Sequence, residues 1–324
     1  MAAVRVVITG MGGELGTAVA QLLEADESIE EIVGLDLYPP RRRLLRAVFH
    51  RVDPRNRERT AAVIAACRPT VLVHLGVYEP YSRSSPRSAV ARTAAGTVAA
   101  VPAAVEAGAL ESIVLRSGIE VYGRRRGAPV RPDEEVVPDP TCGFGHSLLH
   151  AEQVCRDAGS RAGVAVTLLR FATIVGPHVP SPLGRLLRLP AVPFSPLADP
   201  PFSVLHQHDA VAAFVAAVRR PYDGAVNVVG PGAVTASQAA RLGGRIPVPV
   251  VGPGWRGARA LAEAAGAPVP EHVQELLLRG RTADGGRVAG ILGLRRIRPT
   301  PEVVRHLFEW SQVDYLRDPG RLAA

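Results

Sequence analysis

The chain contains no lysine. All 38 of its basic residues are arginine, against 30 acidic residues in a length of 324. This absence excludes Schiff-base chemistry, a phosphate-loop lysine and a catalytic tyrosine assisted by lysine. Asparagine is nearly absent too, occurring only as Asn56 and Asn227. A GC-biased coding sequence accounts for both features, because it favours arginine and alanine over lysine and asparagine.

Aromatic residues are also scarce, at 5% of the chain, and cysteine occurs three times. Few rings are available for stacking on bases, and the arginines are spread over every expected element. The net charge of +8 therefore does not indicate nucleic-acid binding. Cys67, Cys142 and Cys155 lack metal-ligand spacing, which indicates reduced thiols and no metal centre.

A long hydrophobic run is missing as well. The longest uninterrupted one, residues 210–218, is too short to span a bilayer. An expected strand begins at Val4, which leaves no room for a signal peptide. We therefore expect a cytoplasmic protein without a membrane segment.

Short apolar runs alternate with alanine-rich stretches through the first half of the chain. The runs predict strands buried on both faces, at residues 4–8, 32–35, 71–75, 113–115 and 166–169. Helices are expected between them, at residues 15–25, 60–67, 89–107 and 144–158. This βαβ order predicts a Rossmann-type α/β fold with a doubly wound parallel sheet.

The composition changes after Gly176. Eight prolines fall within residues 177–201, which predicts a shaped loop. Regular patterns then return: Asp209 is expected to cap a helix at 210–218, a strand is expected at 225–229, and a final helix at 301–312.

Two parts of the chain are expected to interleave. Residues 1–176 and 203–230 are assigned to a dinucleotide-binding domain, and residues 177–202 and 231–324 to a smaller C-terminal substrate-binding region.

A glycine-rich turn follows the first strand. Gly10, Gly13 and Gly16 fit GxxGxxG, in which glycine permits a tight turn and close approach of the backbone to a pyrophosphate at a helix N-terminus. Asp36, at the end of the second strand, is typical of a carboxylate that binds the ribose of NAD. The run Arg41–Arg43 suits the 2′-phosphate of NADP instead. We favour NADP(H), with NAD(H) as the alternative.

Further segments occur in a specific order along the chain. They are Val52-Asp53, the strand end at 71–76, Val121-Tyr122-Gly123, the LRxxxxxGP segment at 169–177, and residues 204–211. With the glycine turn, they resemble extended short-chain dehydrogenase/reductases of the epimerase/dehydratase type over residues 4–232. The resemblance implies an NAD(P) cofactor whose nicotinamide faces a C-terminal substrate domain.

The resemblance also assigns site residues. The expected cofactor-binding residues are Gly10, Met11, Gly12, Gly13, Glu14, Leu15, Gly16, Asp36, Arg41, Arg42, Asp53, Leu75, Gly76, Arg116 and Phe171. The expected substrate-binding residues are Val77, Tyr78, Ser117, Gly118, Ile119, Glu120, Phe144 and His146.

The family's catalytic tetrad does not carry over onto this sequence. Gly118 stands where the family has serine or threonine, Phe144 replaces the tyrosine, Leu148 the lysine, and Thr93 the asparagine. Among other polar groups, Ser117 and His146 are the catalytic candidates. The alternatives are a strand-end hydroxyl bonded to the backbone for Ser117 and a surface histidine for His146.

The altered tetrad resembles that of atypical ketoreductases in antibiotic tailoring. This likeness implies NAD(P)H-dependent reduction of a carbonyl in an aromatic polyketide of the angucyclinone type. The substrate's own phenol would then supply the proton. Two alternatives stay open: a non-catalytic NAD(P)-binding regulatory protein, and a nucleotide-sugar epimerase or dehydratase. The oligomeric state is left open too.

Overall fold

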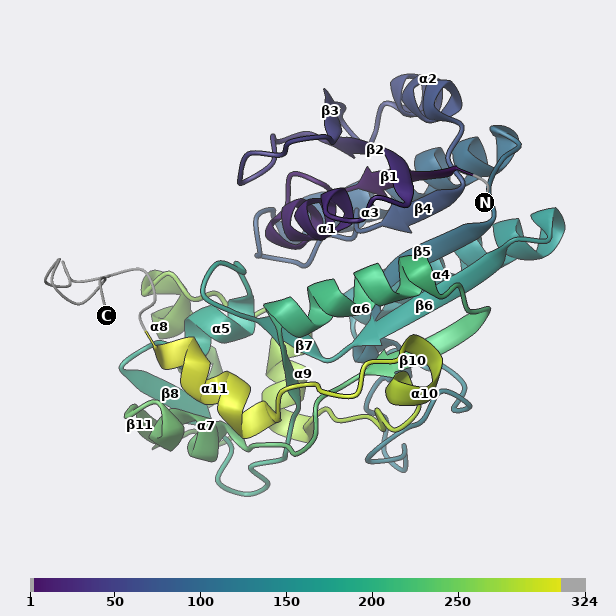
Figure 1. Cartoon of the computed structure of the whole chain (residues 1–324). Helices are drawn as coiled ribbons and strands as arrows, with labels where there is room; N and C mark the ends of the chain where they lie inside the picture. Colours follow the sequence, from purple (N-terminus) through teal and green to yellow (C-terminus); the bar gives the residue numbers. More distant parts are fainter. Residues whose placement is uncertain (1–2, 310–324) are drawn as a thin grey trace, which may run out of the picture.

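Seven parallel strands form the central sheet, in the order β3-β2-β1-β4-β5-β6-β10 (Figure 1). The computed structural model describes residues 3–309. The strands are β1 (Val4–Thr9), β2 (Ile29–Asp36), β3 (Val48–Arg51), β4 (Val71–His74), β5 (Ser112–Gly118), β6 (Ala165–Phe171) and β10 (Gly224–Val228). The strand order reverses at β1 and β4, which confirms the predicted doubly wound Rossmann-type fold.

Helices cover both faces of this sheet. On one face, α1 (Glu14–Glu24) packs beside α6 (Gln207–Arg219). On the other, α2 (Arg57–Cys67), α3 (Pro86–Glu106) and α4 (Gly143–Ala162) pack side by side. The strands are apolar on both faces because each face lies beneath helices, and Val6, Val7 and Ile8 of β1 are fully buried.

One helix within residues 3–309, α3, is long and apolar enough to cross a membrane by length and composition. Half of its apolar window is buried inside the protein. Its place between α2 and α4 is that of a core helix in an α/β fold.

The remaining elements mostly form a smaller group, seen at the lower left of Figure 1. These elements are β7 (Thr173–Val175), α5 (Pro182–Leu187), β8 (Ala191–Phe194), β9 (Val204–His206), α7 (Ala236–Leu242), β11 (Ile246–Pro249), α8 (Gly254–Ala264), α9 (Glu271–Arg279) and α11 (Thr300–Phe308). They enclose a second hydrophobic cluster, which includes Leu183, Phe202 and Leu276. Two short helices lie against the main part instead: η1 (Ile119–Tyr122), which follows β5, and α10 (Val288–Leu292), which packs on β10.

Three local predictions need correction. The proline-rich segment is not a loop throughout, because it contains α5 and β8. Pro182 occupies the first turn of α5, where a missing N–H costs nothing, after the N-cap Ser181. Asp209 does not cap α6: the N-cap is His206, and Asp209 lies in the first turn, where it binds Arg298 at 2.6 Å. The last helix ends at Phe308, and residues 310–312 lie outside the described residues.

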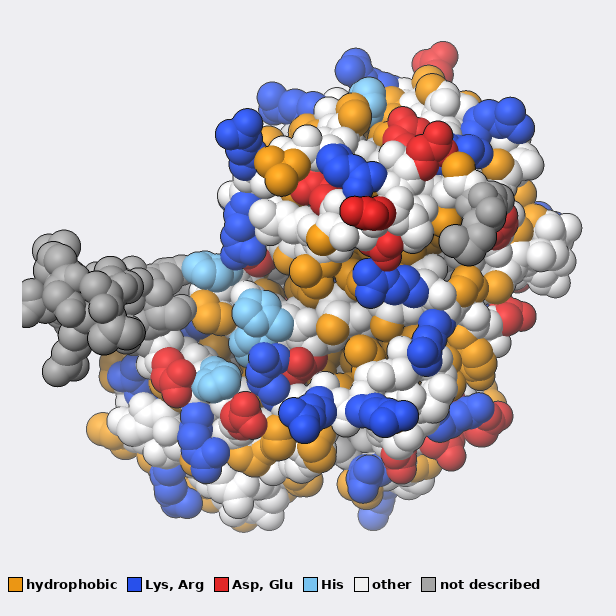
Figure 2. Space-filling view, viewed as in Figure 1, with side chains coloured by type: hydrophobic (Ala, Val, Ile, Leu, Met, Phe, Trp, Pro, Cys, Tyr) orange, Lys and Arg blue, Asp and Glu red, His pale blue; other side chains and the backbone are white. Residues whose placement is uncertain are grey.

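Charged side chains are mixed on the surface. In Figure 2, arginine side chains lie dispersed among acidic and apolar ones on the face that is shown. All three cysteines are free and buried, and burial raises the pKa of Cys67 and of Cys155 to about 12 and of Cys142 to about 11. Within residues 3–309, no group of three His, Cys, Asp or Glu side chains is placed to hold a metal ion.

Candidate active site

The glycine turn connects β1 to α1 and forms one wall of a cleft. Gly10 has φ +75°, in the left-handed region, and packs against the backbone of Leu75. A Cβ on Gly12 would lie 1.9 Å from the Tyr38 carbonyl oxygen, and one on Gly16 would lie 2.2 Å from that of Gly10. These three glycines are therefore required by protein packing. Gly12 is not one of the glycines of the GxxGxxG pattern, although it is among the residues expected to bind the cofactor.

Gly13 differs from the other three glycines. A Cβ there would meet only the Gly10 carbonyl oxygen, at 3.3 Å, and the residue lines the cleft. The space beside it is open toward the cleft, at the N-terminus of α1, where backbone N–H groups favour an anion. This cradle fits a pyrophosphate.

Asp36 closes the same end of the cleft. Its carboxylate accepts hydrogen bonds from the backbone N–H of Gly12 at 3.0 Å, Leu37 at 2.6 Å and Tyr38 at 3.4 Å. Burial raises the pKa of Asp36, and these three N–H groups oppose that rise. The side chain is thus held in one orientation, with the carboxylate bordering the cleft.

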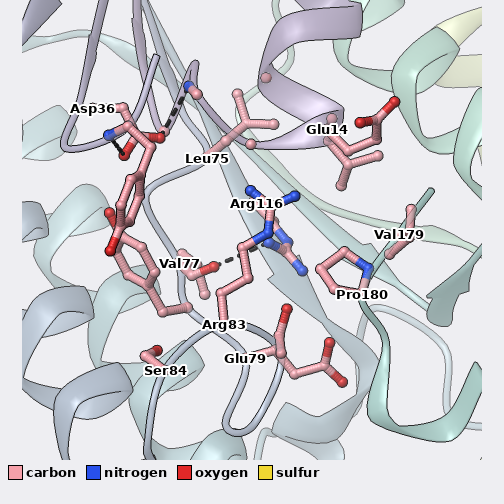
Figure 3. Close-up of a pocket in the computed structure, with 18 of the residues that line it drawn as sticks. Glu14, Asp36, Leu75, Val77, Glu79, Arg83, Ser84, Arg116, Val179 and Pro180 are labelled. Carbon is pink, nitrogen blue, oxygen red and sulfur yellow. Dashed lines mark hydrogen bonds between the residues drawn. The ribbon is translucent and has the colours of Figure 1, made fainter. Parts of the chain in front are cut away.

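The cleft lies between the carboxyl ends of β1 and β4 (Figure 3). Ligands of open α/β sheets bind at such a switch point. Many of the residues predicted to bind the cofactor or substrate line it: Gly10, Gly12, Gly13, Glu14, Leu15, Gly16, Asp36, Leu75, Val77, Tyr78 and Arg116. Burial raises the pKa of the Tyr78 hydroxyl above its ordinary value, so this group stays a neutral phenol.

Several predicted cofactor residues lie outside this lining. Met11 is fully buried beneath the turn. Arg41 and Arg42 do not reach the lining, and Arg42 forms an ion pair with Glu14 at 2.7 Å. Asp53 is paired with Arg55 at 2.7 Å, and this pairing lowers its pKa to about 2.

A second, smaller pocket continues the first between the ends of β5 and β6, β7 and the start of α4. Ser117, Gly118, Glu120, Phe144 and Phe171 contribute to it, as does Leu148. Glu79 and Arg116 line both pockets. Arg116 donates to the carbonyl oxygen of Val77 at 3.0 Å; burial lowers its pKa, while Glu79 and Glu120 oppose that effect.

The two predicted catalytic residues, Ser117 and His146, lie in different surroundings. The Ser117 hydroxyl donates to Glu152 at 2.6 Å, inside a buried polar network. Ser117 therefore borders the small pocket, but its proton is engaged on the side facing the core. His146 is exposed on α4 and lies outside the lining of both pockets. Its catalytic role stays a prediction from the sequence, as does that of Ser117.

Two further predicted residues have clear positions. Gly76 lines an adjoining recess with Thr9, Asp36 and Tyr78. Ile119 is buried in η1, with 2% of its surface exposed.

Sequence reasoning missed Arg83 and Glu79, which reach the cleft from the loop after β4. In Figure 3 the Arg83 side chain extends across the cleft. Burial and the positive charge of Arg41 lower the pKa of Arg83, and the nearby Asp36 and Glu14 carboxylates oppose this effect. The signal that would have identified both residues is their position just beyond a strand's carboxyl end.

His74 lies beneath the glycine turn and is fully buried. The Thr97 hydroxyl donates to the Thr93 carbonyl oxygen at 2.7 Å, so it accepts from His74 Nε2 at 2.9 Å. His74 Nδ1 therefore accepts from the Thr9 hydroxyl at 2.7 Å. The neutral imidazole is the form that satisfies all of these bonds.

We expect the protein to lose stability in acid through this histidine. Burial lowers the pKa of folded His74 to about 4, whereas the unfolded value is 6.5, so the unfolded chain binds the proton first. The stability contribution is fully present above pH 6.5 and is lost as the pH falls toward about 4. It amounts to about 3 kcal/mol.

Urea unfolding across this pH range would measure the loss, with His74→Gln as the comparison. The variant should show a smaller decrease than the parent protein. Part of the decrease should persist, because burial also lowers the pKa of His206 to about 4. Identical pH dependences for parent and variant would contradict the assignment.

Comparison with known proteins agrees with this geometry. The model of the NAD dependent epimerase/dehydratase family matches residues 6–230. The chain belongs to this family. An uncharacterized protein of Mycobacterium tuberculosis is 30% identical over 332 residues, which span 98% of this chain and 86% of that protein.

Two named epimerases are also similar to this epimerase/dehydratase-family chain. A UDP-glucose 4-epimerase of Azospirillum brasilense is 30% identical over 186 residues, which span 56% of this chain and 51% of that protein. The solved structure of the UDP-glucose 4-epimerase of Brucella ovis in complex with NAD has a TM-score of 0.73 at 17% identity. It covers 94% of this chain and 96% of that one, and shows the shared fold.

The family membership supports a nicotinamide cofactor and oxidoreductase chemistry. Phe144 and Leu148, at the positions that the resemblance gives to tyrosine and lysine, lie on the first two turns of α4. Both side chains are buried and line the small pocket beside Gly118. These two side chains offer neither a proton nor a charge to that pocket.

Proposed function

We propose that the protein binds NAD(H) in the cleft between β1 and β4 and uses it to oxidise and reduce a carbinol carbon of a nucleotide sugar. The observation that carries this proposal is the continuous lining from Gly13, through Asp36, to Glu79 and Arg116. Gly13 would face the pyrophosphate and Asp36 the adenosine ribose. When bound, the nicotinamide accepts or donates hydride.

Asp36 favours NAD(H) over NADP(H). Its fixed carboxylate suits two ribose hydroxyls and would repel a 2′-phosphate. Arg41 and Arg42, on which the prediction of NADP rested, lie outside the lining, and Arg42 is paired with Glu14. The complex of the Brucella ovis epimerase with NAD is in line with this choice.

The nucleotide-sugar class is supported by the relatives. The Azospirillum protein is named a UDP-glucose 4-epimerase, and solved structures of similar fold contain UDP-glucose or UDP-glucuronic acid. The polyketide ketoreductase, of which the simocyclinone ketoreductase is the suspected example, was predicted from the altered tetrad, and a shaped loop at residues 177–201 could have bordered a pocket for a large flat ligand. That segment reaches the cleft through Val179 and Pro180, while α5 packs in the second cluster.

Calorimetric titration with NADH and NADPH tests the cofactor. We expect tighter binding of NADH, and we expect Asp36→Asn to weaken NADH binding by about 10- to 100-fold, because hydrogen bonds to a charged group contribute about 1.5–3 kcal/mol. Asp26→Asn, at the far end of α1 in a pair with Arg219, is the matched control and should leave both affinities unchanged. Tighter binding of NADPH by the parent protein would contradict the choice of NAD.

Incubation of the NAD⁺-loaded protein with UDP-glucose or UDP-glucuronic acid tests the substrate class. We expect the absorbance of reduced nicotinamide to appear, or a 4-epimer of the sugar to form. Firm NAD⁺ binding without either change would favour the alternative, a non-catalytic NAD-binding protein.

A further inference from the structure

Glu79 and Arg116 lie where the cofactor cleft meets the small pocket. They come from neighbouring parallel strands: Glu79 follows β4, and Arg116 belongs to β5. In Figure 3 Glu79 is drawn among the side chains that line the cleft, below Arg116. A carboxylate at this junction is within the space that cofactor and substrate would share.

A histidine lies directly behind Glu79. His272 Nε2 is 3.1 Å from Glu79 Oε1, although the two residues are 193 positions apart in the sequence. The side chains are nearly buried, with 3% of His272 and 11% of Glu79 exposed. Glu79 is thus the member of the pair that retains access to the cleft.

The pair is held by α9, which docks on the start of α4. Glu271, the first residue of α9, accepts a hydrogen bond from the backbone N–H of Gly143 at 2.9 Å. The next residue, His272, packs its ring against Phe144, with ring centroids 4.9 Å apart. The phenylalanine that replaces the expected tyrosine therefore supports the imidazole.

Other charged groups surround the pair. Arg116 faces it from β5, and Glu120 faces it from η1. Arg281 bonds Glu120 at 3.3 Å, Glu275 at 2.7 Å and the His272 carbonyl oxygen at 3.1 Å. Arg279 approaches Glu275 within 4.0 Å at the rim, and Arg124 lies nearby. Acidic and basic side chains alternate, so a proton can be exchanged here without leaving an isolated charge.

We propose that Glu79, backed by His272, is the group that takes up and returns the substrate proton. The inference rests on the proposed function. With a nicotinamide bound to accept the hydride, the Glu79 carboxylate would take the hydroxyl proton of the substrate as the carbonyl forms. His272 Nε2 donates to the ionised carboxylate and orients it, so that Glu79 itself holds the proton until it is returned. The reverse sequence restores the alcohol, so that protons and electrons balance in both directions.

The first test needs no substrate. Binding of NAD⁺ and of NADH is measured by calorimetry in buffers of different ionisation enthalpy, at several pH values between about 5 and 8. The oxidised nicotinamide carries a positive charge, so its binding should expel a proton from the pair, whereas NADH should not. We expect the difference in proton release between NAD⁺ and NADH binding to vanish in Glu79→Gln and in His272→Gln.

The same difference in both variants would overturn the proposal, because the pair would then not sense the nicotinamide. A pair with a purely structural role would not produce a proton release that depends on the cofactor's oxidation state. Thermal unfolding shows whether each variant is folded. Glu79→Asp, which keeps the carboxylate, should retain the difference and serves as the second variant.

The second test uses UDP-glucose and the NAD⁺-loaded protein. We expect Glu79→Gln to slow nicotinamide reduction by about 10²-fold. Its NADH affinity should stay within about threefold of the parent value, because the lost group acts on the proton and not on cofactor binding. Glu263→Gln, an exposed site on α8, is the matched control and should change neither quantity. Full activity of Glu79→Gln would overturn the proposal.

The two proposals can fail separately. Proton release on NAD⁺ binding that depends on Glu79, together with no reaction with any UDP-sugar, would reject the nucleotide sugar and keep the proton-transfer pair. If a UDP-sugar reduces the nicotinamide and substitution of Glu79 or His272 has no effect on this reaction, the nucleotide sugar is kept and the proton-transfer pair is rejected.

Discussion

Replacement of Arg170 by methionine, or of Glu152 by glutamine, is expected to lower the free energy of unfolding by about 3–5 kcal/mol. Each side chain is 1% exposed, and two hydrogen bonds of 2.9 and 2.7 Å join them. Burial opposes the charge of Arg170, but the bonds to Glu152 raise its pKa above the ordinary value. Removing Glu152 would leave Arg170 as an uncompensated buried charge, and removing Arg170 would leave Glu152 with the longer ion pair to the half-exposed Arg156, at 3.6 Å.

The effect should be large because this pair connects several strands and helices. Glu152 on α4 accepts from Ser117 on β5, and Arg170 on β6 donates to the Tyr122 hydroxyl at 3.0 Å. Tyr122 in turn donates to Asn227 on β10 at 2.8 Å. One substitution therefore disturbs the polar contacts of β5, β6 and β10 together.

Urea unfolding measures this loss. The double variant Glu152→Leu with Arg170→Met should be more stable than either single one, since an apolar pair leaves no unpaired charge. The exposed pair of Glu135 with Arg287 provides the control, and Glu135→Gln should change stability by less than about 1 kcal/mol. Equal losses at the buried and exposed pairs would refute the interpretation.

We further expect Gly13→Val to weaken NADH binding by at least about 100-fold, through the loss of two or more hydrogen bonds to the pyrophosphate. The new side chain would extend into the cleft, because Gly10 O at 3.3 Å is the protein atom that its Cβ would approach. The melting temperature should change by only a few degrees. Titration calorimetry and thermal unfolding together measure both effects.

Two other glycines separate binding from folding. Gly16→Val should destabilise the protein itself, because its Cβ would lie 2.2 Å from a backbone oxygen. Gly257→Val, with nothing within 4 Å, should affect neither binding nor stability. An unchanged NADH affinity in folded Gly13→Val would remove the pyrophosphate from this site.

The sheet and the glycine turn that lines the cleft were predictable from the sequence because their determinants are local. Apolar runs of strand length and a glycine turn followed by an acidic strand end are each read within about 20 residues. The preference for NADP was drawn from the adjacency of Arg41–Arg43 in the sequence, which does not give the direction of the side chains. In the structure Arg42 is turned toward Glu14.

The end of the cleft at the small pocket could not be predicted from local sequence patterns. Glu79 and His272 meet across 193 positions, and nothing in the residues around His272 marks it as a site residue. Ser117 has the position that the sequence indicates, at the end of β5. The partner of its hydroxyl, Glu152, lies one turn beyond Leu148 on α4 and was visible only in the folded chain.

Because α9 docks on α4, the residues around the cleft come from two separate stretches of the chain, the sheet and α9. These two stretches can change independently in evolution. The sheet carries the groups proposed to hold the nicotinamide cofactor, while the imidazole beside Glu79 is supplied by the first turn of α9. Exchange of the segment around Glu271 and His272 by recombination would alter the proposed proton transfer and leave the glycine turn intact. A lineage could in this way acquire a new reaction from its C-terminal region.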